Sequence, residues 1–280
     1  MIGVIDVGGG LRDIYGAAIF DYCIDNNIEF DCCIGVSAGS ANMASYLGRQ
    51  KKRNYTYYTE YAFRKEYMCL GNFIKKGSYL DLDYVYSELS NKGKEYPLNY
   101  DNIAASKSMF KVVALDALTG KPKYFDKSDM AQDQYDILKA SSAIPAVCKP
   151  YVVDGVPYYD GGAADPIPID YAFSLGCDKV VLILTRPTTY KRVQKKDNFP
   201  AKMIRKKYPK AAESLLQRYQ MYNDGVELAL KYEKEGKMLI LAPDEASCEG
   251  IGTLTKDIAR LNKLYEKGYE DAEKLVEFMK

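Results

Sequence analysis

Short apolar runs alternate with segments of helical periodicity through the first two thirds of the chain. The runs predict buried strands, and the periodic segments predict helices packed on one face. This alternation is typical of an α/β domain with a largely parallel sheet. The strands are predicted at 2–7, 30–34, 110–115 and 179–184, and the helices at 13–26, 38–47, 130–142 and 168–175.

Two hairpins interrupt this alternation. The first is predicted between 111–117 and 122–125, joined at Thr119-Gly120, and the second spans 151–159 around Asp154-Gly155. The second hairpin is followed directly by Asp160-Gly161-Gly162, which places these residues at the end of a strand. We therefore expect an antiparallel margin on an otherwise parallel sheet.

The last third of the chain is predicted to be mainly helical. Long periodic stretches occur at 211–235 and 253–280, with one strand at 237–241 between them. We predict a catalytic domain over residues 1–190 and a helical C-terminal extension over 191–280, packed on the same unit. The pattern assigns no chemistry to this extension.

A tyrosine-rich insertion precedes the third strand. Helices are predicted at 55–66 and 79–89, and five tyrosines fall within thirteen residues: Tyr55, Tyr57, Tyr58, Tyr61 and Tyr67. Tyrosine joins an apolar body to a polar tip, which suits both a lid over a wet site and ordinary helix packing. Both interpretations remain open, with packing the simpler one.

Charge and composition exclude several function classes. The chain has 280 residues and a formal net charge of +1, so no global field attracts nucleic acid. A strand-like start without a basic and apolar leader, together with no apolar run of about 20 residues, predicts a soluble cytoplasmic protein. The seven cysteines lack C-x-x-C spacing and are expected to be reduced core thiols, although Cys32 or Cys33 offers an alternative nucleophile.

One basic segment stands out against this neutral background. Nine of the twenty residues from 191 to 210 are Lys or Arg, and Asp197 is the only acidic one. Such a run is usually a solvated face. It also suits peripheral contact with anionic lipid head groups, and we keep this as the alternative.

The segment Gly35-Val36-Ser37-Ala38-Gly39 directly follows the strand at 30–34 and precedes a helix. A G-x-S-x-G sequence in this context is typical of a nucleophile elbow, which exposes a serine hydroxyl on a sharp turn. The chain contains no histidine, so a Ser-His-Asp triad is excluded. A nucleophilic Ser37 therefore requires another base.

A glycine-rich turn, Gly8-Gly9-Gly10, follows the first strand and is succeeded by Arg12. Consecutive glycine amides can be directed at an anion, which suits an oxyanion hole. The competing dinucleotide motif requires a third glycine where this chain has Asp13, and a carboxylate there would repel a pyrophosphate.

Asp160 is the candidate base. It ends an apolar and aromatic hairpin, and such surroundings raise a carboxyl pKa above its reference of about 3.9. A carboxylate within hydrogen-bond reach can take the serine proton as the oxygen attacks. On spacing alone, Asp-Gly-Gly is also an ordinary turn.

Together these motifs resemble the bacterial patatin-like phospholipases, which combine a glycine-rich loop, G-x-S-x-G and a distant D-G-[AG]. The resemblance covers residues 1 to about 187 and includes 140–145, 165–168 and 181–187. It implies a three-layer α/β patatin-like fold, with a mostly parallel central sheet between helices. One departure is Asp13, because the family commonly has glycine after the basic residue of the loop.

The resemblance also implies the roles of the site residues. Ser37 is the nucleophile and Asp160 the base of a dyad without histidine. The oxyanion donors are the amides of Gly8, Gly9, Gly10 and Ala38, and the supporting motif residues are Arg12, Gly35, Gly39, Gly161 and Gly162. No cofactor and no metal ion is required.

The implied activity is hydrolysis of fatty-acyl esters of phospholipids or other lipids. Two alternatives remain open. One is an esterase or thioesterase that acts on another acyl substrate. The other is a catalytically weak binding or regulatory member of the same fold, for which Asp13 would be the sign.

Overall fold

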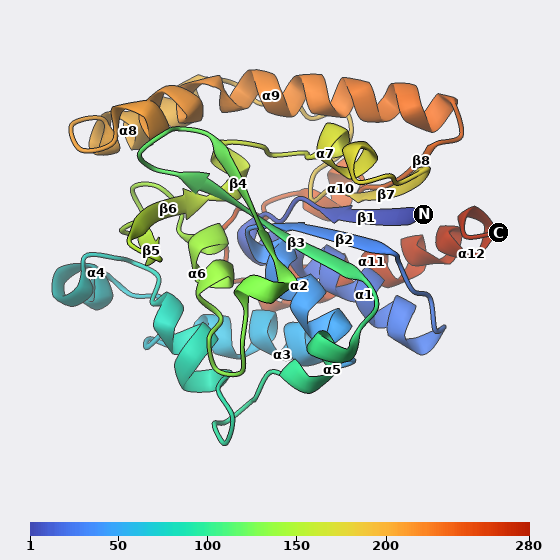
Figure 1. Cartoon of the computed structure of the whole chain (residues 1–280), viewed down its shortest axis with the longest axis horizontal. Helices are drawn as coiled ribbons and strands as arrows, with labels where there is room; N and C mark the ends of the chain where they lie inside the picture. Colours follow the sequence, from blue (N-terminus) through green and yellow to red (C-terminus); the bar gives the residue numbers. More distant parts are fainter.

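The structure is a computed structural model that describes residues 1–280, and it has three layers around one central sheet (Figure 1). The strand order is β5-β6-β3-β2-β1-β7-β8, with β4 also paired to β3. The strands are β1 (Ile2–Asp6), β2 (Cys32–Val36), β3 (Met109–Asp116), β4 (Pro122–Asp126), β5 (Tyr151–Val153), β6 (Val156–Asp160), β7 (Lys179–Ile183) and β8 (Met238–Leu241).

The sheet is parallel at its centre and antiparallel at one margin. β1 pairs in parallel with β2 and β7, and β2–β3 and β7–β8 are parallel as well. The antiparallel pairs are β3–β4, β3–β6 and β5–β6. Both predicted hairpins are therefore present, and the predicted mostly parallel α/β fold is confirmed.

Helices cover both faces of the sheet. In Figure 1, α7 and α9 lie above it, and α1, α2, α3, α5 and α11 lie below. The helices are α1 (Ile14–Asp25), α2 (Ala38–Leu47), α3 (Arg53–Thr59), α4 (Leu70–Lys76), α5 (Tyr100–Ala105), α6 (Asp136–Ser142), α7 (Ile169–Ser174), α8 (Lys195–Ile204), α9 (Pro209–Lys234), α10 (Glu245–Cys248), α11 (Ile258–Asp271) and α12 (Leu275–Phe278).

Several predicted helices are shorter than their apolar pattern suggested. The segment 130–142 is helical only from Asp136, and 55–66 divides into α3 and a short 3-10 turn at Tyr61–Phe63. The segment 79–89 forms a π-helical turn only over Tyr84–Leu89. These segments bury aromatic side chains in irregular backbone, and tertiary packing overrides the helical period there.

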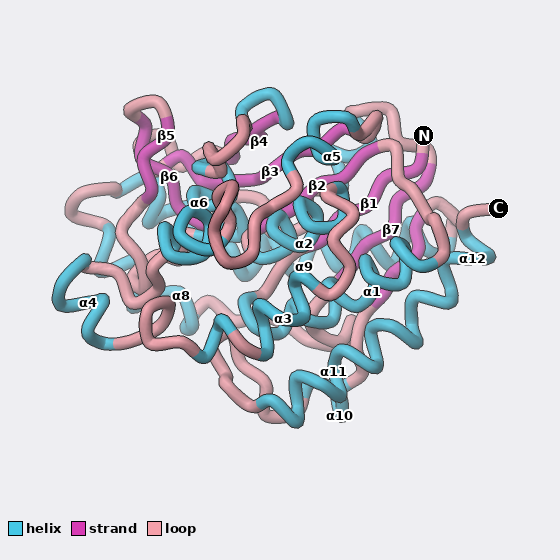
Figure 2. Tube along the Cα trace, turned by 90° about the horizontal axis from the view of Figure 1, so that it is seen from below, coloured by secondary structure: helices cyan, strands magenta, loops and turns pink.

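The C-terminal residues complete the central sheet and cover one of its faces. β8 extends the sheet beyond β7, and α11 packs along α1, as Figure 2 shows from below. Gly268 on α11 permits this contact, since a β carbon there would lie 2.4 Å from the carbonyl oxygen of Tyr15. β7 and β8 thus lie on opposite sides of the predicted domain boundary at 190/191, although they are paired in one sheet. No helix is both long and apolar enough to cross a membrane.

Candidate functional site

Ser37 lies on the turn between β2 and α2, at the carboxyl end of a central parallel strand. Open α/β sheets place ligands at this edge. The backbone of Ser37 has φ 57° and ψ −127°, an uncommon conformation for a residue with a side chain. Strain of this kind is characteristic of the nucleophile elbow.

A second serine holds this strained turn in place. The Ser37 amide donates to Ser141 Oγ at 2.8 Å, and the Ser141 hydroxyl donates in turn to the Val113 carbonyl at 2.6 Å. The Ser37 carbonyl accepts the Ser40 hydroxyl at 2.6 Å. The main chain of Ser37 is therefore hydrogen-bonded on both sides, and its side chain remains available.

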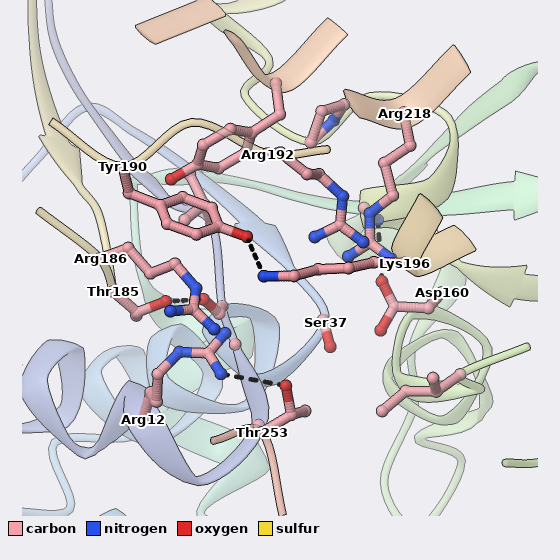
Figure 3. Close-up of a pocket in the computed structure, with 18 residues that line it drawn as sticks. Arg12, Ser37, Asp160, Thr185, Arg186, Tyr190, Arg192, Lys196, Arg218 and Thr253 are labelled. Atoms are coloured by element: carbon pink, nitrogen blue, oxygen red, sulfur yellow. Dashed lines mark hydrogen bonds between the residues drawn. The ribbon is translucent and has the colours of Figure 1, made fainter. Parts of the chain in front are cut away.

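Asp160, at the end of β6, faces the Ser37 hydroxyl across the cleft (Figure 3). Its side chain is only 6% exposed, and its Oδ1 accepts the Gly162 amide at 2.8 Å. Burial raises the pKa of Asp160, against the opposing effects of Arg218, of the Ser37 hydrogen bond and of the Gly162 amide. A carboxylate with a raised pKa next to a serine is suited to proton transfer.

The glycine loop lies beside Ser37 and presents free amides. The amides of Gly9, Gly10 and Ala38 donate to no group of the chain. Gly9 and Gly10 have φ values of 148° and 61°, which glycine adopts without a steric penalty. These three residues line the cavities that also contain Ser37, and unpaired amides in such a site can accept an oxyanion.

The amide of Gly8 has a different partner from the one the sequence suggested. It donates to the buried carboxyl of Asp6 at 3.1 Å, and the Gly8 carbonyl accepts the Thr185 hydroxyl at 2.6 Å. The Gly8 main chain is thus fully paired inside the protein. Gly8 anchors the loop, and it is not an available oxyanion donor.

The remaining motif residues shape this region. Gly35 lies at the end of β2, and Gly39 packs in the first turn of α2 against the Asp6 backbone. Gly161 packs against the Val113 backbone, and Gly162 donates its amide to the side chain of Asp160, which caps the short 3-10 turn. Arg12 is buried at the edge of the cleft, where its Nη1 donates to Thr253 Oγ1 at 3.0 Å.

Two cavities of opposite character meet at Ser37. One is a cleft of about 220 Å³ lined by Ser37, Asp160, the glycine loop and several arginines. The other is a narrow pocket of about 40 Å³, lined mainly by apolar and aromatic side chains. The tyrosines of its wall are Tyr57, Tyr58, Tyr67 and Tyr86. The tyrosine-rich insertion therefore packs on the domain and also forms one wall of this pocket.

Sequence reasoning missed the contribution of the C-terminal extension to the cleft. Arg192, Lys196 and Arg218 line it, and Thr253 lines both cavities. Two of these residues belong to the basic segment 191–210, whose composition alone indicates a solvated face or a lipid contact. Arg218 and Thr253 carry no local motif, because only the tertiary fold brings them to the loop.

A serine elbow at the carboxyl edge of a three-layer α/β sheet is typical of acyl hydrolases. The sequence model "Patatin-like phospholipase" matches residues 7–173, so the chain belongs to the patatin-like phospholipase family, a family of lipid acyl hydrolases. The resemblance noted from the motifs is thereby confirmed. A second model, a domain of unknown function (DUF6363), matches residues 208–280.

Two individual proteins resemble the chain. The uncharacterized protein YjjU of Escherichia coli (strain K12) is 29% identical over 192 residues, which are 67% of this chain and 52% of that protein. The chain thus spans about half the length of this relative. The crystal structure of VipD from Legionella pneumophila has a TM-score of 0.50 at 12% identity and covers 98% of this chain and 66% of VipD, which shows the fold.

Proposed function

We propose that the protein hydrolyses fatty-acyl esters of lipids through a Ser37–Asp160 dyad. The observation that carries the proposal is that Ser37 faces a buried carboxylate, while three residues with unpaired amides line the cavities that meet at Ser37. In this mechanism Asp160 takes the proton of Ser37 as the serine oxygen attacks the ester carbonyl. The amides of Gly9, Gly10 and Ala38 stabilise the oxyanion.

Collapse of the intermediate breaks the ester bond and leaves an acyl group on Ser37. The departing alcohol takes the proton held by Asp160, which returns as a carboxylate. A water molecule then gives its proton to Asp160 and attacks the acyl-enzyme, and Asp160 returns that proton to Ser37 as the fatty acid leaves. The narrow apolar pocket beside Ser37 is suited to the acyl chain.

The test of the dyad is intact-mass analysis after incubation with a fluorophosphonate. We expect one adduct on the wild type, none on Ser37→Ala and slowed labelling of Asp160→Asn. A folded wild type that takes no adduct would contradict the proposal and favour a binding or regulatory protein. Rates on thioesters and simple esters compared with lipid esters then separate the esterase and thioesterase alternative.

Asp13 does not favour the weak-activity alternative. Its side chain is fully buried behind the loop, against Asp6, and it does not line the cleft. The amides of Gly9 and Gly10 remain unpaired in its presence. The departure from the family pattern therefore changes how the loop is supported and leaves its donors free.

We further propose that the protein contacts lipid surfaces with the end that carries α4 and α8 (Figure 1). Leu70 and Ile74 on α4 are 75% and 85% exposed, and Phe199 on α8 is 69% exposed, with lysines on both helices. Apolar side chains flanked by lysines suit insertion at an anionic interface.

Co-sedimentation with phosphatidylserine vesicles tests this contact. We expect Ile74→Ser combined with Phe199→Ser to weaken binding. Val276→Ser, at a 47% exposed position on α12 at the opposite end, is the matched control and should bind as the wild type does. Equal binding by all three proteins would remove this surface from consideration.

A further inference from the structure

The cleft in front of Ser37 is strongly cationic. Five basic side chains line it: Arg12, Arg186, Arg192, Lys196 and Arg218. Two of these are matched by carboxylates inside the protein. Arg192 donates to both oxygens of Asp197, at 3.0 and 2.7 Å, and Arg218 lies 3.8 Å from Asp197 and near Asp160.

The other three cations have no carboxylate partner. Arg12, Arg186 and Lys196 take part in no ion pair of the chain. Arg12 and Arg186 lie close enough for their like charges to repel, and burial together with this repulsion lowers the pKa of Arg12 to about 10. Neighbouring cations without a counter-charge are costly unless an anion joins them.

Among the three cations, Arg12 lacks a charged partner most clearly. Its side chain is only 7% exposed, and its buried Nε has no hydrogen-bond acceptor. Its one partner in the chain is the hydroxyl of Thr253, which is neutral. The chain thus gives this buried cation no anionic partner, and because Arg12 lines the cleft, an anion bound in the cleft can supply the missing counter-charge.

Arg186 and Lys196 are oriented by one tyrosine. The Arg186 guanidinium lies 4.4 Å from the centre of the Tyr190 ring, and the Lys196 ammonium donates to the Tyr190 hydroxyl at 3.0 Å. In Figure 3 these two groups and Arg12 surround the open space on the Tyr190 side of Ser37. The three cations therefore border one common space beside the nucleophile.

We propose that Arg12, Arg186 and Lys196 form a subsite for a phosphate group on the alcohol half of the ester substrate. The proposal rests on the proposed hydrolysis at Ser37. The planar guanidinium fork matches the oxygens of a phosphate, and a phosphate monoester carries about −1.5 to −2 charges, which three unmatched cations can balance.

The position of the apolar pocket fixes the direction of the substrate. This pocket opens on the Ala38 and Tyr86 side of Ser37, whereas the cations lie on the Arg186 side. An acyl chain in the apolar pocket places the ester carbonyl at Ser37 and the alcohol in the cationic cleft. The substrate class is therefore an acylated alcohol phosphate, and the phosphate stays with the leaving alcohol.

The experiment compares two soluble substrates with the same acyl chain, 1-acylglycerol and 1-acylglycerol 3-phosphate, both below their micelle concentrations. We expect wild-type kcat/KM to be higher for the phosphate ester. Arg186→Gln and Lys196→Gln should each lower the ratio of the two kcat/KM values by roughly tenfold or more, because each loses a charge-assisted contact. Lys195→Gln removes the same charge from the exposed neighbouring position and should keep the wild-type ratio.

The outcomes separate this inference from the proposed function. A wild type that hydrolyses neither substrate and takes no fluorophosphonate adduct overturns the dyad. A wild type that is labelled and active but shows equal kcat/KM for the two substrates, or an unchanged ratio in Arg186→Gln, overturns the phosphate subsite alone. Inorganic phosphate should inhibit 1-acylglycerol hydrolysis competitively. Inhibition without preference for the phosphate ester would mean that the cleft binds free phosphate, and would also overturn the assignment.

Discussion

The Asp13 carboxyl lies beside that of Asp6 beneath the glycine loop, neither residue is exposed to solvent, and no donor of the chain reaches either Asp13 oxygen. Asp6 also accepts the Gly8 amide and the Asn42 side chain, at 3.1 and 3.2 Å. Gly16 on α1 leaves room for the pair, since a β carbon there would lie 2.6 Å from Asp13 Oδ1. The two acids therefore support the glycine loop from below.

This pair makes stability depend on pH. Burial raises the pKa of Asp6 to about 6 and that of Asp13 well above its ordinary value. A carboxyl with a higher pKa in the folded chain destabilises the fold progressively as pH rises from the unfolded value of about 3.9 through the folded one. The folded protein should therefore lose stability between about pH 4 and the raised pKa values of the pair.

Asp13→Asn is predicted to remove part of this loss. An amide cannot ionise, and its NH₂ group can donate to the adjacent carboxyl of Asp6. We expect the free energy of unfolding at pH 8 to rise by about 1 kcal/mol or more, with a smaller change at pH 4. Urea unfolding at the two pH values measures this. If Asp13→Asn lowered the free energy of unfolding equally at pH 8 and pH 4, ionisation of the pair would not be what destabilises the wild type at high pH.

The acid limb of kcat/KM is predicted to report Asp160. Burial raises the pKa of Asp160, and the positive charge of Arg218 is the strongest effect that opposes this rise. Removal of the Arg218 charge should therefore raise the pKa of Asp160 further. The base must be ionised to accept the proton, and Arg218→Gln should therefore lose activity from the acid side first. Its acid limb should lie at higher pH than that of the wild type.

Arg218→Lys is the control for this prediction because it keeps the positive charge. Its acid limb should stay near the wild-type position. The measurement is kcat/KM on a neutral p-nitrophenyl ester from pH 4 to pH 9, with folding verified at each end. If the limb did not move in Arg218→Gln, or persisted in Asp160→Asn, another group would be titrating.

A β carbon at Gly10 is predicted to damage catalysis directly. It would lie 2.3 Å from the Thr253 carbonyl oxygen, whose acceptance of the Leu11 amide at 2.8 Å holds the loop. Displacement of the loop removes oxyanion donors, and loss of one such donor costs about 10²- to 10³-fold in kcat. Gly10→Ala should show a loss of this size.

Gly93→Ala provides the matched control. Gly93 also has a positive φ, 77° against 61° at Gly10, but no atom lies within 4 Å of its added β carbon. Both variants carry the same type of backbone strain, about 1 kcal/mol. Only Gly10→Ala should lose kcat. An equal loss in both would assign the effect to general destabilisation.

The sequence motifs predicted the central residues of the site because each motif is formed by neighbouring residues. The residues of G-x-S-x-G are neighbours in sequence, and the turn they form needs only β2 and α2. Asp160 could be found because it ends a hairpin of recognisable pattern. The three-layer fold followed from the alternation of strands and helices together with the family resemblance.

The contacts that surround this centre are not local, and the sequence did not reveal them. Ser141 supports Ser37 across 104 positions of the chain, and Thr253 holds Arg12 across 241. Gly8 was predicted as an oxyanion donor because an amide next to the loop appears free until its partner, Asp6, is located. The basic segment is uniform in its sequence, yet Arg192 and Lys196 line the cleft, whereas Lys195, which is exposed as Lys196 is, does not line it.

Leu80 is predicted to limit the length of the acyl chain that the enzyme accepts. Leu80 is buried in the wall of the narrow pocket beside Ser37, and Leu82 is also buried but does not line that pocket. Truncation of either leucine to alanine should cost roughly 2–5 kcal/mol of stability, so folding alone does not distinguish the two variants. Leu80→Ala alone should enlarge the pocket, and it should raise the ratio of kcat/KM for a p-nitrophenyl decanoate to that for a butyrate. Leu82→Ala should keep the wild-type ratio, and an identical ratio in both variants would place the acyl chain elsewhere in the site.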